Sequence, residues 1–176
     1  MTTANPLPKP RYPDRPYQVA VVCLGNICRS PIADVVLRRA LENAGIGDRV
    51  AVDSSGTGDW HLGHPMDRRA AAALATAGYD GSAHRAQQFT EEWYDRYDLI
   101  LAMDENNFRD ISALAPDEDT ARERVRMFRE FDPRSTYGDV EVPDPYYGGD
   151  DGFTLVLRMV ERTSEGLAEA LGKHLA

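Results

Sequence analysis

The sequence predicts an α/β fold of three layers (α/β/α), in which helices cover both faces of a four-stranded parallel sheet. Short apolar runs rich in β-branched residues alternate along the chain with longer segments whose apolar residues recur at helical spacing. The 176 residues are 42% hydrophobic, which is enough for one good core and too little for two. We therefore expect a single domain.

The first strand and the first helix have the clearest signals. Residues 17–23 form a short β-branched run suited to a buried strand. Ser30 is a good N-cap, Pro31 favours a first helical position, and Gly45 ends a helix near residues 31–44. The later elements are expected in this order: a strand near 49–53, an alanine-rich helix over 67–77, a short helix capped by Thr90, a strand over 99–103, a helix near 105–114, acidic loop charges and caps at 117–119, a strand over 125–128, and a long last helix marked by apolar residues from Phe153 to Leu171.

Composition limits the remaining possibilities. Residues 1–16 contain five prolines and no apolar run, so we expect a disordered extension and not a signal peptide, with the domain over 17–176. No stretch is long enough to span a membrane, and low cysteine use favours a cytoplasmic protein. The net charge of −9 argues against a nucleic-acid partner. Two cysteines without a paired Cys/His cluster predict neither a metal site nor a cofactor.

The turn between the first strand and the first helix predicts an anion site. From Cys23 to Pro31 the chain reads Cys-Leu-Gly-Asn-Ile-Cys-Arg-Ser-Pro. The backbone N–H groups of residues 24–29, wrapped around the helix N-terminus, would point at one centre. Gly25 and Asn26 tolerate the positive φ that such a wrap requires. We therefore expect a phosphate-binding loop here, with phosphate or another oxyanion as its ligand.

The same turn contains a candidate nucleophile. The helix N-terminus, Arg29 and a hydroxyl such as Ser30 would stabilise a thiolate at Cys23, and Arg29 could grip two phosphate oxygens. Thiolate attack on phosphorus would give a cysteinyl-phosphate and divide hydrolysis into two displacements. A buried packing thiol is the alternative for Cys23, and the adjoining Gly-Asn turn, Arg29 and Ser-Pro pair disfavour it.

The first displacement needs a general acid, and Asp144 is the best candidate. It lies between two prolines, which stiffen the backbone, and Tyr146 and Tyr147 follow it and could stack on an aryl substrate. An isolated aspartate in such a segment is more often a turn residue. The prediction of Asp144 as an acid therefore depends on the presence of Cys23 and Arg29 in the same chain.

Cys23 to Pro31, together with Asp144-Pro145-Tyr146-Tyr147, resembles the low-molecular-weight protein tyrosine phosphatase family in its bacterial form. The resemblance implies Cys23 as nucleophile, Arg29 as phosphate clamp, and Asp144 as acid in the first step and base in the second. It extends from about Tyr17 to the C-terminal helix through further segments in the same order: Val52-Asp53-Ser54, Asp59-Trp60, Ala83-His84-Arg85-Ala86 and Met103-Asp104.

The resemblance also implies the supporting residues. Ser30 would hydrogen-bond to the Cys23 sulfur, and Asn26, Ser54 and His84 would form a network that holds the loop. The residues expected to surround the substrate are Leu24, Gly25, Asn26, Ile27, Cys28, Ser30, Trp60, Tyr146 and Tyr147. On the residues alone, Ser54 reads as a turn residue, His84 as structural and Trp60 as cover for the core.

The implied activity is hydrolysis of phosphotyrosine in tyrosine-phosphorylated proteins, by a monomer or weak dimer. An arsenate reductase shares the fold and the loop, but it needs cysteines outside the loop, and this chain has two cysteines, both within it. A phosphoarginine phosphatase has threonine where this chain has Ile27, and the apolar Ile27 suits an aryl phosphate. A non-catalytic phosphotyrosine-binding module would be expected to lack one of Cys23, Arg29 and Asp144.

Cys28 has two interpretations. It is a packing thiol, or it captures Cys23 as a disulfide after Cys23 is oxidised to sulfenic acid, which would protect the nucleophile reversibly. The second interpretation predicts redox regulation.

Overall fold

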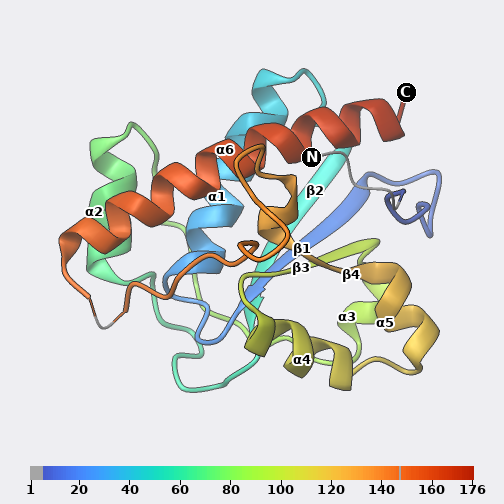
Figure 1. Cartoon of the computed structure of the whole chain (residues 1–176), viewed down its shortest axis with the longest axis horizontal. Helices are drawn as coiled ribbons and strands as arrows, with labels where there is room; N and C mark the ends of the chain where they lie inside the picture. The colour runs from blue at the N-terminus through green and yellow to red at the C-terminus, as the bar shows by residue number, and fades with distance from the viewer. Residues whose placement is uncertain (1–5, 147) are drawn as a thin grey trace.

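A computed structural model describes residues 6–146 and 148–176 and has a parallel sheet at its centre (Figure 1). The sheet contains four strands in the order β2-β1-β3-β4, and every neighbouring pair is parallel. The strands are β1 (Tyr17–Cys23), β2 (Val50–Gly56), β3 (Leu99–Ala102) and β4 (Val125–Met127). The predicted fold class is confirmed.

Helices cover both faces of this sheet (Figure 1). One layer consists of α1 (Arg29–Asn43), α2 (Arg68–Thr76) and α6 (Asp150–His174). The other consists of α3 (Trp93–Arg96), α4 (Glu105–Ala113) and α5 (Glu118–Arg124), and a single 3-10 turn, η1 (Phe128–Phe131), follows β4. Within the described residues, the helices are all too short or too polar to cross a membrane.

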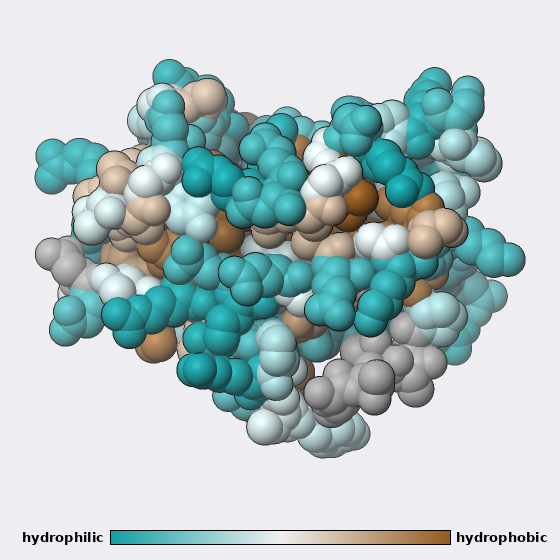
Figure 2. All heavy atoms as spheres, turned by 90° about the horizontal axis from the view of Figure 1, so that it is seen from above, coloured by the Kyte–Doolittle hydropathy of each residue, from teal (hydrophilic) through white to brown (hydrophobic). Residues whose placement is uncertain are grey.

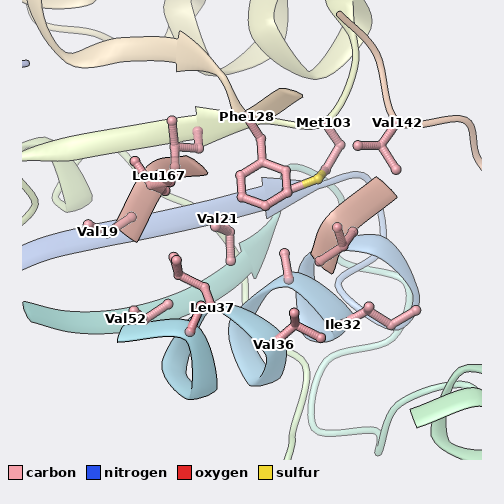
Figure 3. Close-up of a cluster of buried hydrophobic side chains, with 14 of the residues drawn as sticks. Val19, Val21, Ile32, Val36, Leu37, Val52, Met103, Phe128, Val142 and Leu167 are labelled. Atoms are coloured by element: carbon pink, nitrogen blue, oxygen red, sulfur yellow. The ribbon is translucent and has the colours of Figure 1, made fainter. Parts of the chain in front are cut away.

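The central strand supplies side chains to two separate cores. Val19 and Val21 of β1 pack in the core beneath α1 and α6, whereas Ala20 and Val22 pack in the core on the opposite face. Successive side chains of a strand point to opposite faces, so an almost fully apolar strand requires both layers of helices. Figure 3 shows the first core, where Val21 lies near Leu37 of α1 and Phe128.

The last helix closes the first of these cores. Its buried residues include Val156, Val160, Leu167 and Leu171, whose spacing places them on one face. The opposite side of α6 faces solvent, and the view from above shows a mostly hydrophilic surface with hydrophobic residues visible between polar ones (Figure 2).

The sheet places the end of β1 at its carboxyl edge. The parallel register pairs Cys23 with Gly56, the last residue of β2, and pairs Val22 with Ala102, the last residue of β3. The turn after Cys23 and the segment after Ala102 therefore leave the sheet side by side. Ligands of open parallel sheets bind at this edge.

The start of α1 differs from the prediction. Cys28 occupies the N-cap position without a side-chain cap, and the helix begins at Arg29. Ser30 as N-cap was wrong, because its hydroxyl lies against the Cys23 sulfur instead. The end agrees better, since Gly45, with φ 78, follows the C-cap residue Ala44.

One further local element differs from the prediction, and another agrees with it only in part. The short α3 has Glu92 as its N-cap residue, so Thr90 as its cap was wrong. Asp117 is confirmed as a cap, because it is the N-cap residue of the seven-residue helix α5 and its side chain accepts a hydrogen bond from the Thr120 N–H. Glu118 and Asp119 lie in the first turn of this helix and not in a loop. The helix buries only Arg124, so it has no apolar periodicity by which the sequence could predict it.

Residues 6–16, expected as part of a disordered extension, contain no helix or strand, yet their backbone is bonded to the domain. The Pro8 carbonyl accepts hydrogen bonds from the Tyr17 hydroxyl at 2.8 Å and His174 Nε2 at 3.0 Å. The Lys9 carbonyl accepts one from Arg124 at 2.9 Å. Prolines leave carbonyls free to accept such bonds, which composition alone does not reveal. Residues 1–5 lie outside the described part of the chain.

Phe128→Ala tests the packing of the first core. The Phe128 ring is fully buried, so its removal should lower the free energy of unfolding by about 3–5 kcal/mol. Urea denaturation measures the change. Tyr137→Ala is the matched control, because Tyr137 is 95% exposed and its loss should cost less than about 0.5 kcal/mol. Similar losses in the two variants would contradict this account of the core.

Candidate active site

The turn between β1 and α1 wraps around the sulfur of Cys23. Asn26 takes φ 57, in the left-handed region, and its backbone N–H donates to Cys23 Sγ at 3.3 Å. Gly56 allows the turn to lie against β2, since a Cβ at this position would come within 2.6 Å of the Leu24 carbonyl oxygen. The loop is thus curled tightly over its first residue, which left-handed backbone and a missing side chain make possible.

A hydrogen-bond network supports Asn26 in this conformation. Its side-chain amide donates to Ser30 Oγ at 2.8 Å and to Ser54 Oγ at 3.1 Å, and its Oδ1 accepts from the Gln87 N–H at 2.9 Å. His84 Nε2 lies 2.7 Å from the Asn26 carbonyl oxygen and donates to it. The structure therefore brings together Asn26, Ser54 and His84, and adds Gln87, which the sequence analysis missed.

The Ser30 hydroxyl has a hydrogen-bond acceptor whether Cys23 is a thiol or a thiolate. Its oxygen lies 3.0 Å from Cys23 Sγ and 3.2 Å from the Ser55 carbonyl oxygen, while it accepts from Asn26. With a thiol at Cys23, the hydroxyl can donate to Ser55. With a thiolate, it can turn and donate to the sulfur, so neither state leaves the buried hydroxyl unsatisfied.

Arg29 is held beside the sulfur by two acceptors from distant parts of the chain. Its Nη1 donates to Asp104 Oδ2 at 2.6 Å and to the Val142 carbonyl at 2.9 Å. Burial acts to lower the pKa of Arg29, but the charges of Cys23, Asp104 and Asp144 together outweigh burial and raise that pKa above its usual value. Arg29 is therefore a fixed cation at the base of the loop.

Asp104 is a site residue that the sequence analysis quoted without giving it a role. It follows β3, the neighbour of β1 in the sheet, so the parallel register brings it to Arg29. It also caps α4 by accepting from the Asn107 N–H at 2.8 Å. An acidic residue directly after a buried strand was the available signal, but only the strand order could connect it to Arg29.

The Asp144 carboxylate lies over the same site. Its Oδ2 is 3.6 Å from Arg29 Nη2, and its side chain remains 39% exposed. The loop before it is anchored where the Val142 N–H donates to the Met103 carbonyl at 2.7 Å, and the loop after it turns where the Tyr146 N–H donates to Asp144 at 3.1 Å. A carboxylate thus lies within reach of both Arg29 and solvent.

These groups line a cavity of about 360 Å³. Its rim includes two exposed aromatic side chains, Trp60 and Tyr146, which are 67% and 37% exposed. The lining residues are Cys23, Leu24, Gly25, Ile27, Cys28, Arg29, Trp60, His61, Asp144 and Tyr146.

The lining differs from the predicted set in two respects. Asn26 and Ser30 lie beneath the loop and support it instead of lining the cavity. His61 is an addition that the sequence analysis missed, and its ring centroid lies 6.4 Å from that of Tyr146. Tyr147 lies outside the described residues. A larger groove of about 750 Å³, between α2 and α6, contains none of the predicted site residues.

The second cysteine of the loop is a buried thiol. Cys23 and Cys28 are both free. Burial raises the pKa of Cys28, with further contributions from the charges of Asp67 and Cys23. Cys28 is therefore a protonated thiol at neutral pH, in contrast to what a nucleophile requires.

The geometry accommodates a tetrahedral anion. A sulfur lies at the centre of a curled backbone, with a fixed cation on one side and a carboxylate above. Residues 6–146 and 148–176 contain no group of three His, Cys, Asp or Glu side chains placed to hold a metal ion. The arrangement can bind a phosphate group, attack it with sulfur and transfer a proton.

Comparisons with known proteins identify a family. A model described as "Low molecular weight phosphotyrosine protein phosphatase" matches residues 18–176. A low molecular weight protein-tyrosine-phosphatase of Streptomyces coelicolor is 50% identical over 159 residues, covering 90% of this chain and 96% of the relative. Low molecular weight protein-tyrosine phosphatase A of Mycobacterium tuberculosis is 42% identical over 161 residues, covering 92% and 95%.

Solved structures give the same result. A protein tyrosine phosphatase of Entamoeba histolytica, crystallised with Hepes in the active site, aligns with a TM-score of 0.83 and 30% identity over 89% of this chain and 97% of that one. The tyrosine phosphatase Wzb of Escherichia coli K30, in complex with sulphate, aligns with a TM-score of 0.75 and 33% identity, covering 88% and 98%.

The pH dependence of stability, compared between the wild type and His84→Gln, tests the role of His84 in supporting the loop. Burial lowers the pKa of His84, and its bond to the Asn26 carbonyl only partly opposes this. As pH falls through about 6.5, the unfolded chain binds a proton at this histidine that the folded protein does not, so stability decreases. Glutamine can still donate to the Asn26 carbonyl but does not titrate.

We therefore expect the wild type to lose more free energy of unfolding than His84→Gln between about pH 7 and pH 5. Urea titrations at each pH measure the difference. Equal losses in the two proteins would contradict a neutral His84 in the folded state.

Proposed function

This chain belongs to the low molecular weight phosphotyrosine protein phosphatase family, and we propose that it hydrolyses phosphotyrosine in proteins through a phosphoryl group carried on Cys23. The family supplies the class of reaction, protein-tyrosine-phosphatase. The observation that carries the mechanism is a sulfur enclosed by the loop, with the Arg29 guanidinium and the Asp144 carboxylate 3.6 Å apart above it.

Binding places the phosphorus atom over the sulfur. The loop N–H groups and the N-terminus of α1 receive the phosphate oxygens, and Arg29 pairs with two of them. Arg29 does not have to reorganise, because Asp104 and the Val142 carbonyl already fix its guanidinium.

In the first step the Cys23 thiolate attacks phosphorus and the bond to the tyrosine oxygen breaks. Ser30 and the Asn26 N–H hold the thiolate, at 3.0 Å and 3.3 Å from Sγ. Asp144 gives its proton to the departing phenolate, so tyrosine leaves neutral. The products are a dephosphorylated protein and a cysteinyl-phosphate.

In the second step water attacks the cysteinyl-phosphate. The Asp144 carboxylate, partly exposed to solvent, takes a proton from this water as it bonds to phosphorus. The sulfur–phosphorus bond breaks, phosphate is released, and the thiolate returns to its bonds with Ser30 and Asn26. Ser30 thus stabilises sulfur both as nucleophile and as leaving group.

The walls of the cavity favour an aromatic phosphoester. Ile27 lines the cavity, and the exposed rings of Trp60 and Tyr146 lie at its rim. Apolar and aromatic walls contact a tyrosine ring well. A shorter phosphoserine would leave them unfilled.

We also propose that a reversible disulfide between Cys23 and Cys28 of the same loop protects Cys23 from further oxidation. A peroxide that oxidises Cys23 to its sulfenic acid leaves an electrophilic sulfur in the loop that also contains Cys28. Oxidation removes the thiolate charge of Cys23, which is one cause of the raised pKa of Cys28. Cys28 would then give up its proton and bond to Cys23 through sulfur, the sulfenic hydroxyl would leave as water, and a thiol reductant would restore both thiols. Because Cys28 is protonated when the enzyme is active, it does not compete with Cys23 as nucleophile.

Phosphate release from synthetic peptides tests the activity. Under reducing conditions the wild type should hydrolyse a phosphotyrosine peptide and leave matched phosphoserine and phosphoarginine peptides intact. Cys23→Ser should abolish release yet still bind inorganic phosphate in calorimetry, because the loop N–H groups and Arg29 remain. Release mainly from phosphoarginine, or release that survives in Cys23→Ser, would contradict the proposal.

Asp144→Ala tests the acid. Loss of a general acid matters most when the leaving group is a poor one, so kcat/KM, which reports the first step alone, should fall by about 10²-fold or more for phenyl phosphates of high phenol pKa. For nitrophenyl-type leaving groups, which depart without a proton, the loss should be much smaller. A plot of kcat/KM against phenol pKa measures this, and an equal loss across the series would exclude Asp144 as the acid.

A further inference from the structure

Arg69, which the reaction does not use, bonds to the loop that carries Asp144. It is the second residue of α2, and its side chain reaches across to the segment after Asp144. Its Nη2 donates to the Tyr146 carbonyl at 2.8 Å, and its Nη1 donates to the Gly148 carbonyl at 3.1 Å. The guanidinium also lies 5.7 Å above the Tyr146 ring and 4.7 Å above that of Phe153, at the start of α6.

The other side of Arg69 is connected to the phosphate-binding loop. Asp67 receives two hydrogen bonds from the guanidinium, from Nε at 3.2 Å and from Nη2 at 3.1 Å. The backbone N–H of Asp67 donates to the Ile27 carbonyl at 2.8 Å. A continuous chain of bonds therefore joins Ile27, beside the sulfur, to Tyr146, beside the acid.

The Arg69 bonds hold the part of the loop that follows Asp144, whereas Arg29 holds the part that precedes it. Before Asp144, the Val142 carbonyl is bound by Arg29 and the Val142 N–H by Met103. After Asp144, the Arg69 bonds to residues 146 and 148 fix the loop against α2. Figure 1 shows this loop leading into α6, which packs beside α2. Asp144 is thus held from both sides.

We propose that Arg69 is a positioning residue, which keeps the Asp144 carboxylate over the cavity by tying its loop to the phosphate-binding loop. The inference rests on the proposed function, because it presupposes that Asp144 is the acid. Only a planar guanidinium can serve two backbone carbonyls and a bidentate carboxylate at once, so lysine is not an equivalent residue here.

The effect of Arg69 is local. Its side chain is 35% exposed and the carbonyls it binds belong to an exposed loop, so water can replace its bonds when it is removed. Exposed ion pairs contribute little to stability. Asp67 also keeps its cap on α2, because it accepts from the Arg69 backbone N–H at 2.8 Å. Loss of the side chain should therefore free the acid loop without unfolding the domain.

Kinetics on a series of aryl phosphates tests the proposal. We expect Arg69→Ala to lower kcat/KM, which reports the first step alone, by about tenfold for poor leaving groups and to leave good leaving groups almost unaffected. Arg69→Lys, which can keep one carbonyl bond, should show a smaller loss of the same kind. Arg68→Ala is the matched control, since Arg68 is the exposed neighbour of Arg69 in α2 and should behave like the wild type.

Two further measurements separate positioning from general damage. The rate at which iodoacetate alkylates Cys23 reports the phosphate-binding loop, and it should be unchanged in Arg69→Ala. Thermal unfolding should shift by no more than about 2 °C. If Arg69→Ala is poorly folded, Arg69→Lys carries the test.

The outcomes distinguish this inference from the proposed function. A leaving-group dependence in both Asp144→Ala and Arg69→Ala supports the inference. If Asp144→Ala shows it and Arg69→Ala resembles the wild type, or loses equally on every substrate, the positioning role is overturned and the acid assignment stands. If Asp144→Ala shows no such dependence, the acid assignment fails and the inference fails with it.

Discussion

The site depends on one unfavourable backbone conformation, the left-handed turn at Asn26. Only with φ near 57 can the chain leave β1, curl over the Cys23 sulfur and enter α1 within five residues. Asparagine tolerates this conformation better than most residues, and its amide is bonded on both sides by Ser30, Ser54 and Gln87. Strain at a functional turn persists only when its surroundings determine it so completely. The loop is therefore preorganised for an anion before one arrives.

Charge balance explains why a chain of net charge −9 can bind an anion. The long-range field is repulsive, so attraction must come from groups at short range. Arg29 supplies it, and its burial with Asp104 at 2.6 Å keeps it aimed at the loop without a bound ligand. Asp104 and the Val142 carbonyl hold Nη1 of the guanidinium, so this pair fixes the geometry of the site as well as balancing a buried charge.

Local sequence patterns predict the strand, turn and helix around Cys23, but not the contacts of Arg29 with distant parts of the chain. The apolar run before Cys23, the Gly25-Asn26 pair and the positive-φ Gly45 identify the strand, the turn and the end of the helix from the residues alone. Asp104 and Val142 contact Arg29 across 75 and 113 positions, and no local pattern contains that information. Ser30 fits the sequence rule for an N-cap, but its hydroxyl lies against the Cys23 sulfur. The helix N-terminus stays uncapped, which leaves its N–H groups for a ligand.

The two groups that we propose as catalytic, Cys23 and Asp144, have opposite structural requirements, and two arginines meet both of them. The sulfur needs a fixed position, so it lies at the buried end of β1. The proposed acid, Asp144, has to exchange protons with water, and it lies on an exposed loop with its side chain partly open to solvent. A carboxylate on such a loop has no fixed position relative to the sulfur unless both ends of the loop are held. Arg29 binds the segment before Asp144 and Arg69 the segment after it, and both arginines connect to the turn around Cys23. The turn that orients the nucleophile thereby also sets the position of the acid.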